Sequence, residues 1–204
     1  MGKKFEMATV KPAQMDKEHM LALKGIYMAP YMQLATALIG KARFAGGNMF
    51  RHQIDTMGIL IDYGYIDGIL LKAACVHDVV EDLPDFNQDL IRNADEDGEE
   101  VLKLVLEVTK RKGQLKQEYL RHIIAEGSQK AKILKCADRI SNMISLGFVT
   151  SGEFIERYCD ETECFIFPIA LEVDYNMYQE LINLVCSRRT YLEASGYFDK
   201  KESD

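Results

Sequence analysis

The sequence has little of what a secreted, membrane-bound or nucleic-acid-binding protein needs. Its N-terminus has no apolar signal core, and no apolar run reaches the length of a membrane span. The net charge of −7 at pH 7 argues against a general affinity for nucleic acid or for membrane surfaces. The five cysteines are odd in number and show no CxxC spacing, which argues against a disulfide framework. We therefore expect a reduced, cytoplasmic protein that binds neither nucleic acid nor membranes.

The chain also has only four prolines and little alternation of polar and apolar residues. Apolar residues instead recur at helical spacing, and no segment predicts a strand. There is no internal repeat and no low-complexity linker, and 204 residues suit one sizeable core. The sequence thus predicts a single all-α domain over residues 17–196, with flexible termini at 1–16 and 197–204. It carries no signal for an oligomeric state.

The stretch ACVHDVVEDL places one histidine and three carboxylates among apolar residues. The pattern predicts a continuous helix over residues 67–82, in which residues four apart share a face. His77 would then lie beside Glu81, and Asp78 beside Asp82, while His77 and Asp78 both reach one point next to the helix. Burying unpaired carboxylates is costly, and a cation would relieve that cost. Imidazole and carboxylate ligands suit a divalent transition metal, so we predict a metal site here.

Two further ligands are available from other predicted helices. His52 lies in FRHQIDTMGIL and Asp138 lies in KILKCADRISNM, and each is polar within an apolar segment. Together with His77 and Asp78 they would supply two imidazoles and two carboxylates. The remaining two carboxylates of HDVVED would lie one helical turn further along.

Each of these residues alone also has a structural interpretation. A histidine on an apolar face is more often a satisfied core residue than a ligand, and Asp138 followed by Arg139 is compatible with a simple ion pair. Glu81 and Asp82 are compatible with a solvated helix end before the turn at Pro84. The adjacent histidine and aspartate inside AACVHDVV are harder to explain structurally, so the whole set favours the metal site.

In their order along the chain, these motifs resemble those of the HD-domain phosphohydrolases. A histidine, then HD, then a distant aspartate is the metal signature of that superfamily. HDVVED has the HD…ED form seen in the hydrolase domain of RelA/SpoT proteins and in small alarmone hydrolases. Four further segments resemble that branch in the same order: GKARFAGGNMFRH, VLKLVLEVTK, LKCADRISNMISL, and ETECFIFPIA followed by QEL. The resemblance spans roughly residues 22–185.

The resemblance implies a single-domain HD-type helical bundle over residues 17–196 that uses Mn²⁺ or another divalent metal. It implies removal of the 3′-diphosphate from guanosine tetra- or pentaphosphate, with release of pyrophosphate. The residues implied fall into three groups by role: metal ligands His52, His77, Asp78 and Asp138; acid–base residues Glu81 and Asp82; and the substrate residues Arg43 facing the base, Asn142 at the sugar and Ser145 near the nucleotide. Apart from the resemblance, Lys41 is a candidate to offset the charge of the substrate in this acidic protein.

This chain departs from the family pattern on the side that would read the base. Leu38 stands where a histidine is usual, Lys41 replaces a glutamine, and Phe44 and Ala45 replace a lysine and a serine after the base-facing arginine. Leu83 replaces the threonine that usually follows the ED pair. A related nucleotide is therefore an alternative substrate, including a 2′- or 3′-phosphorylated dinucleotide.

Three other classes of protein stay open at this point. The first is an HD-domain nucleotidase that acts on nucleoside monophosphates. The second is a non-catalytic nucleotide sensor, against which the intact Glu81–Asp82 pair argues. The third is a structural helical protein, which would bind no stoichiometric metal.

Overall fold

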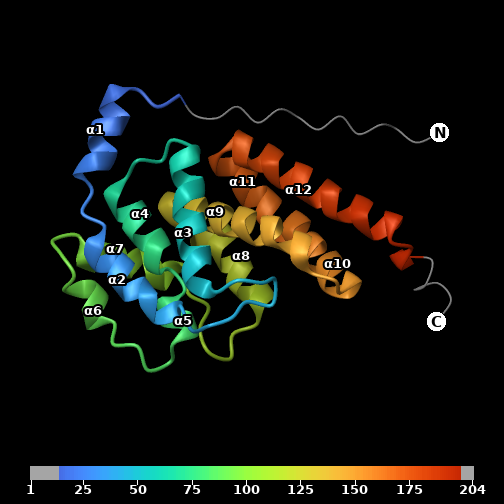
Figure 1. The fold of residues 1–204 in the computed structure, drawn as a ribbon, viewed down its shortest axis with the longest axis horizontal. Coiled ribbons are helices and arrows are strands. Elements are labelled where there is room, and N and C mark those ends of the chain that lie inside the picture. The colour runs from blue at the N-terminus through green and yellow to red at the C-terminus, as the bar shows by residue number, and fades with distance from the viewer. Residues whose placement is uncertain (1–13, 199–204) are drawn as a thin grey trace.

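The computed structural model describes residues 14–198, and its regular elements are all helical (Figure 1). An isolated bridge between Ala42 and Asn48 is the only β pairing in that range. The helices, of which η1 and η2 are 3₁₀-helices and η3 is a π-helix, are α1 (Lys17–Gly25), α2 (Ala29–Ala35), η1 (Thr36–Leu38), α3 (Met49–Asp62), α4 (Gly68–Val76), α5 (Val79–Asp82), α6 (Asp89–Arg92), α7 (Gly98–Val108), α8 (Lys116–Glu126), α9 (Gln129–Ser145), η2 (Leu146–Phe148), α10 (Gly152–Glu161), η3 (Thr162–Ile166), α11 (Phe167–Val173) and α12 (Tyr175–Ala194). The predicted all-α bundle is confirmed.

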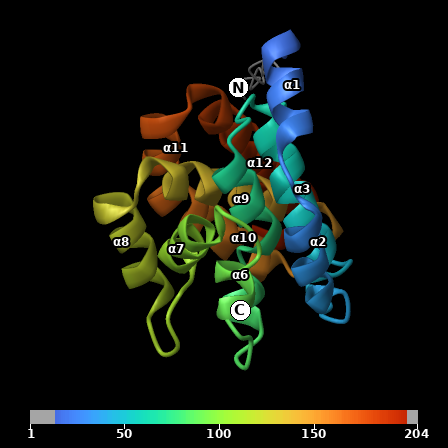
Figure 2. The same cartoon turned by 90° about the vertical axis from the view of Figure 1, so that its left-hand side faces the viewer.

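Helix α9 forms the centre of the bundle. Eleven of its 17 residues are buried, because α3, α7, α11 and α12 all pack against it. Figures 1 and 2 show α9 in the middle of the molecule, whereas α1 lies at its edge and buries no residue. A polar side chain on the inner face of α9 is therefore shielded from water and must find its partners within the protein. None of the helices among residues 14–198 combines the length and apolar composition that a membrane span requires.

Three side-chain caps fix where the helices around the polar cluster begin. The carboxamide oxygen of Asn48 accepts the Arg51 N–H at 2.9 Å and starts α3. The carboxylate of Asp67 accepts the Leu70 N–H at 2.9 Å and starts α4, and Ser128 caps α9 in the same way. Such caps satisfy amide groups that have no partner within the helix. The caps therefore fix the register in which α3 and α9 present their inner faces to each other.

The continuous helix predicted over residues 67–82 is interrupted at His77 and Asp78, between α4 and α5. The backbone carbonyl of Ala74 faces His77 Nδ1 at 2.8 Å instead of receiving the amide four residues later. The amide of Asp78 donates to the side-chain oxygen of Gln53 on α3 at 3.3 Å. In a continuous helix the Asp78 amide would donate to the Ala74 carbonyl. The helix is interrupted because each of these two groups contacts a side chain instead.

The structure describes the first two residues of the predicted flexible tail, 197 and 198. Tyr197, which we assigned to the flexible tail, donates its hydroxyl to Glu156 on α10 at 3.1 Å. Its ring lies so close to Gly152 that an added Cβ there would meet the Tyr197 ring at 2.3 Å. Most of the two predicted flexible termini, residues 1–13 and 199–204, lies outside the described residues.

Candidate active site

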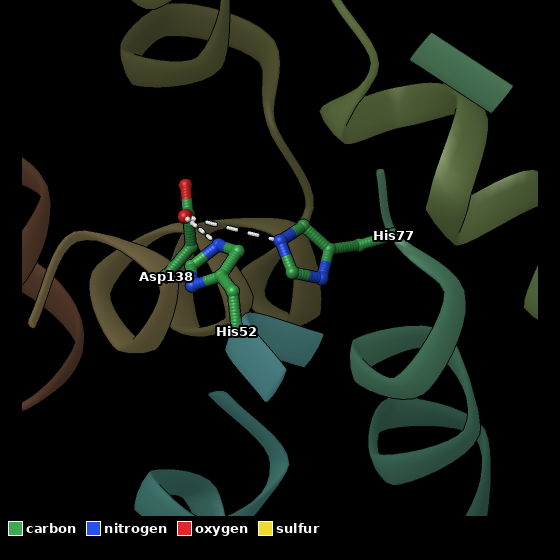
Figure 3. Close-up of side chains that lie close together, drawn as sticks. All are labelled: His52, His77 and Asp138. Atoms are coloured by element: carbon green, nitrogen blue, oxygen red, sulfur yellow. Dashed lines mark hydrogen bonds and ion pairs between the residues drawn. The ribbon is translucent and has the colours of Figure 1, made fainter. Parts of the chain in front are cut away.

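Two histidines and one aspartate from three separate segments meet inside the bundle (Figure 3). His52 lies in α3, His77 follows α4, and Asp138 lies in α9. All three residues are buried, and one ligand atom of each lies within 4.8 Å of the others. The Nε2 atom of His52 is 3.0 Å from Asp138 Oδ1, and that of His77 is 3.8 Å from the same oxygen. These three side chains can hold a divalent metal ion.

The fourth predicted ligand, Asp78, lies against both imidazoles. Its Oδ2 atom is 3.2 Å from His77 Nε2 and 3.5 Å from His52 Nε2. Gln53, the neighbour of His52, donates to the same Asp78 oxygen at 2.9 Å. The structure therefore brings together all four residues that the sequence nominated as metal ligands.

The partners behind the two rings leave both Nε2 atoms facing the carboxylates. His77 Nδ1 lies 2.8 Å from the Ala74 carbonyl, which can only accept, so Nδ1 must donate. His52 Nδ1 lies 2.9 Å from the Ser141 hydroxyl. His77 Nε2 is buried and has no hydrogen-bond partner, which is uncommon for a buried polar atom. Each ring is held at Nδ1 while its Nε2 faces the carboxylates, with His52 Nε2 bonded to Asp138 Oδ1 at 3.0 Å. Metal-ligating histidines are typically held at the second nitrogen in this way, so this donor set fits a divalent cation.

Asp138 is held by two further side chains of α9. Lys135 Nζ lies 2.7 Å from Asp138 Oδ2, and the Asn142 amide donates to Oδ1 at 2.5 Å. The sequence analysis did not assign a role to Lys135, Ser141 or Gln53. Spacing offered a signal for two of them, because residues three apart on a helix are neighbours and both Lys135 and Ser141 lie three residues from Asp138.

Electrostatics within the cluster favour charged forms despite burial. Burial disfavours the imidazolium of His77, but the carboxylates of Asp78 and Asp138 raise its pKa to about 10. Burial would raise the pKa of Asp78, but His77 lowers it to about 2. Lys135 and the two histidines likewise hold the pKa of Asp138 well below its usual range. The cluster is therefore a place where negative charge attracts a proton or a cation.

The two carboxylates proposed for acid–base work lie on α5, and each faces a cation. Glu81 Oε2 accepts the backbone N–H of Lys110 at 2.9 Å, and the Lys110 ammonium is 3.9 Å from Oε1. Asp82 pairs with Lys41, whose ammonium lies 2.6 Å from Oδ1 and also donates to the Asp82 carbonyl at 3.1 Å. Lys41 therefore lies beside the two carboxylates that the sequence analysis predicted for acid–base work.

The other predicted substrate residues, Arg43, Asn142 and Ser145, contact one another beside Asp138. The guanidinium of Arg43 donates to Asn142 Oδ1 at 2.8 Å and to Ser145 Oγ at 3.1 Å. Arg43 is presented by a tight loop in which Gly46 and Gly47 have φ values of 86° and 72°, a region that glycine adopts without strain. Lys41, Arg43, Asp82 and Asn142 line one cleft of about 280 Å³.

Arg139, for which the sequence offered a simple ion pair with Asp138, does not line this cleft. Its guanidinium is buried, donates to Glu161 Oε1 at 2.5 Å and to Thr162 Oγ1 at 3.2 Å, and lies 4.2 Å from the Tyr158 ring centroid. Arg139 therefore joins α9 to the start of the π-helix η3.

Comparison with known proteins identifies a similar solved structure. It is described as "A metazoan ortholog of SpoT hydrolyzes ppGpp and plays a role in starvation responses", and it superposes with a TM-score of 0.66 at 25% sequence identity. The match covers 86% of this chain and 98% of that one. No family model and no curated protein sequence matches the chain. The predicted resemblance to HD-type alarmone hydrolases is confirmed by this fold and by the His–His–Asp cluster.

Proposed function

We propose, from the fold shared with a ppGpp hydrolase, that this chain is a metal-dependent pyrophosphohydrolase of 3′-diphosphorylated guanosine nucleotides. Its substrates would be guanosine tetra- and pentaphosphate, and its products pyrophosphate and the corresponding 5′-phosphorylated guanosine. Mn²⁺ is the metal we propose. The five cysteines are free in the structure, which suits the cytoplasmic location that we expect.

One observation carries this proposal. The Nε2 atoms of His52 and His77 face the oxygens of Asp78 and Asp138, while both Nδ1 atoms face other partners. The buried Nε2 of His77 lies 3.2 Å from Asp78 Oδ2 without a hydrogen bond to it, whereas a structural histidine of the core would bond through that nitrogen. The arrangement supports a metal centre better than it supports a packing role.

The cluster would supply Lewis-acid chemistry when a divalent cation is bound, polarising a phosphate oxygen and activating water near neutral pH. Glu81 and Asp82 would position the attacking water and accept its proton, a contribution typically worth about 10²–10⁴ in rate. Lys41 and Arg43 would balance the charge of the phosphate groups in a protein whose net charge is −7. Asn142 bonds both Asp138 and Arg43, so it links the metal side of the cleft to the nucleotide side.

The proposal is tested by incubating the purified chain with guanosine tetraphosphate and Mn²⁺ and identifying the products. We expect GDP and pyrophosphate, and we expect the Glu81→Gln/Asp82→Asn variant to lose about 10²-fold or more in rate. A matched control is Glu99→Gln/Glu100→Gln on α7, which also changes two adjacent carboxylates but leaves α5 intact.

Two outcomes would redirect the proposal. Release of inorganic phosphate from nucleoside monophosphates, with guanosine tetraphosphate untouched, would favour a nucleotidase. Tight nucleotide binding without turnover of any nucleotide in a panel would favour a sensor.

A further inference from the structure

Aromatic side chains form part of the cleft that Lys41, Asp82 and Asn142 line. Phe44 is 72% exposed, and its ring centroid lies 4.9 Å from that of Phe154 on α10. Phe154 in turn stacks on Tyr158, with centroids 5.7 Å apart and ring planes 18° from parallel. All three rings line the same cleft as Lys41, Asp82 and Asn142. A row of three aromatic rings in contact therefore lines the same cleft as Asp82, one of the two proposed acid–base residues.

The charged and amide side chains that line this cleft are engaged by partners within the protein. Lys41 is engaged by Asp82, and the guanidinium of Arg43 is engaged by Asn142 and Ser145. The other side chains that line the cleft are apolar or aromatic apart from the Tyr158 hydroxyl. A base placed there would meet ring faces rather than a fixed set of donors and acceptors.

Two of the three rings also have a cationic side chain near the ring face. The Arg157 guanidinium lies 5.3 Å from the Phe154 centroid, and the Lys116 ammonium lies 5.0 Å from the Tyr158 centroid. Neither phenylalanine has a polar atom of its own, so Phe44 and Phe154 can hold a planar ligand only by stacking and apolar contact. Stacking accepts any base, because every base has a π face.

We propose that Phe44 and Phe154 form a stacking platform for the substrate's base, so that the cleft takes both purines and does not select guanine. This inference rests on the proposed function, since it places the phosphates at Lys41 and the metal cluster and the base against the aromatic rings. Sites that hydrogen-bond a ligand reject analogues strongly, whereas apolar sites discriminate weakly. The substrate class is thus a 3′-phosphorylated purine nucleotide.

The test is a calorimetric titration with guanosine and adenosine 3′,5′-bisphosphates. The host is the Mn²⁺-loaded Glu81→Gln/Asp82→Asn variant, which retains every predicted metal ligand and is expected not to consume the probe. The dissociation constants for the two bisphosphates should differ by less than about threefold, because stacking is tolerant of base identity. Adding Phe44→Leu should weaken both by about 5- to 20-fold, the lower part of the range for one base–aromatic stack, since leucine keeps some apolar contact.

Two matched substitutions separate stacking from other effects. Phe44→Tyr keeps an aromatic face and should bind both nucleotides as the parent does. Phe148→Leu makes the same change at another exposed phenylalanine, 80% exposed and not lining the cleft, and should have no effect.

The inference is overturned if guanine binds more than about tenfold tighter than adenine, the discrimination expected of hydrogen-bond readout. It is also overturned if Phe44→Leu has no effect or affects one base only, or if neither bisphosphate binds. Failure of the proposed function would appear separately, as absence of pyrophosphate release by the unmodified chain, because the titration does not measure turnover.

Discussion

Among single residues, the hydroxyl of Ser141 has the clearest supporting role, because it faces His52 Nδ1 in a fully buried setting. Replacing Ser141 with alanine would leave that nitrogen without a partner and the ring free to rotate. We expect Ser141→Ala to lower Mn²⁺ affinity by about 10- to 100-fold, the usual loss when a partner behind a ligating histidine is removed. Calorimetric titration of the metal-free protein with Mn²⁺ measures this loss.

Ser145 provides the matched control, since it lies one turn later on α9 and its hydroxyl accepts from Arg43 instead. Ser145→Ala should leave Mn²⁺ affinity unchanged. Equal losses in the two variants would show that the effect comes from α9 as a whole and not from the orientation of His52.

The charge state of His77 predicts how metal binding depends on pH. Burial opposes protonation, but Asp78 and Asp138 raise the pKa of His77 to about 10 in the metal-free protein. Below that pH the ring carries a proton that a metal must displace. We expect Mn²⁺ binding near neutral pH to release about one proton, and the apparent affinity to fall about tenfold for each unit by which pH is lowered. Titrations in buffers of different ionisation enthalpy count the released protons, and binding without proton release would refute the assignment.

At the scale of elements, the break between α4 and α5 shows what the sequence could and could not predict. The helical spacing correctly placed the last four residues of HDVVED on a helix and predicted that His77 and Asp78 reach a common point, but these two residues themselves lie in the break. The break itself depends on Gln53 of α3, which takes the amide of Asp78. A partner 25 residues away leaves no trace in local periodicity, so this feature required the structure.

The aromatic row of the cleft is a second feature that local patterns could not reveal. The sequence singled out Phe44 only as a departure from the family. Phe154 and Tyr158 come from α10, more than 100 residues later in the chain, and nothing in their own segment connects them to Phe44. Contacts of this kind arise only when the bundle closes around α9.

The junction of α9, α10 and η3 yields a stability prediction. Arg139 is buried and binds Glu161 and Thr162, so its removal leaves Glu161 with Lys116 as its remaining charged partner. We expect Arg139→Met to lower the free energy of unfolding by about 3 kcal/mol, near the low end for a broken buried ion pair. Urea unfolding followed by circular dichroism measures this loss.

Arg189 on α12 provides the comparison, because it also binds two carboxylates, Asp160 and Glu163, but remains 32% exposed. Arg189→Met should cost less than about 1 kcal/mol, as surface ion pairs usually do. A similar loss for both variants would mean that burial does not distinguish the two pairs.

At the scale of the whole molecule, ligands from distant parts of the chain are held by one central helix. His52, His77 and Asp138 span 86 residues of sequence between the first and the last, yet α3 and α4 bring the histidines to the face of α9 that carries the aspartate. The order of motifs along the chain predicted this convergence through its resemblance to a known fold, whereas the distances and partners needed the structure. The proposed chemistry requires that these three side chains bind one metal ion.

Metal stoichiometry is therefore the most direct test. The chain, stripped with a chelator and dialysed against Mn²⁺, should retain one Mn²⁺ per chain when its metal content is measured by elemental analysis. The His77→Gln variant should retain none, while His122→Gln, which changes an exposed histidine, should retain one. No bound metal in the unmodified chain, or equal retention by the His77 and His122 variants, would contradict a metal centre at this cluster.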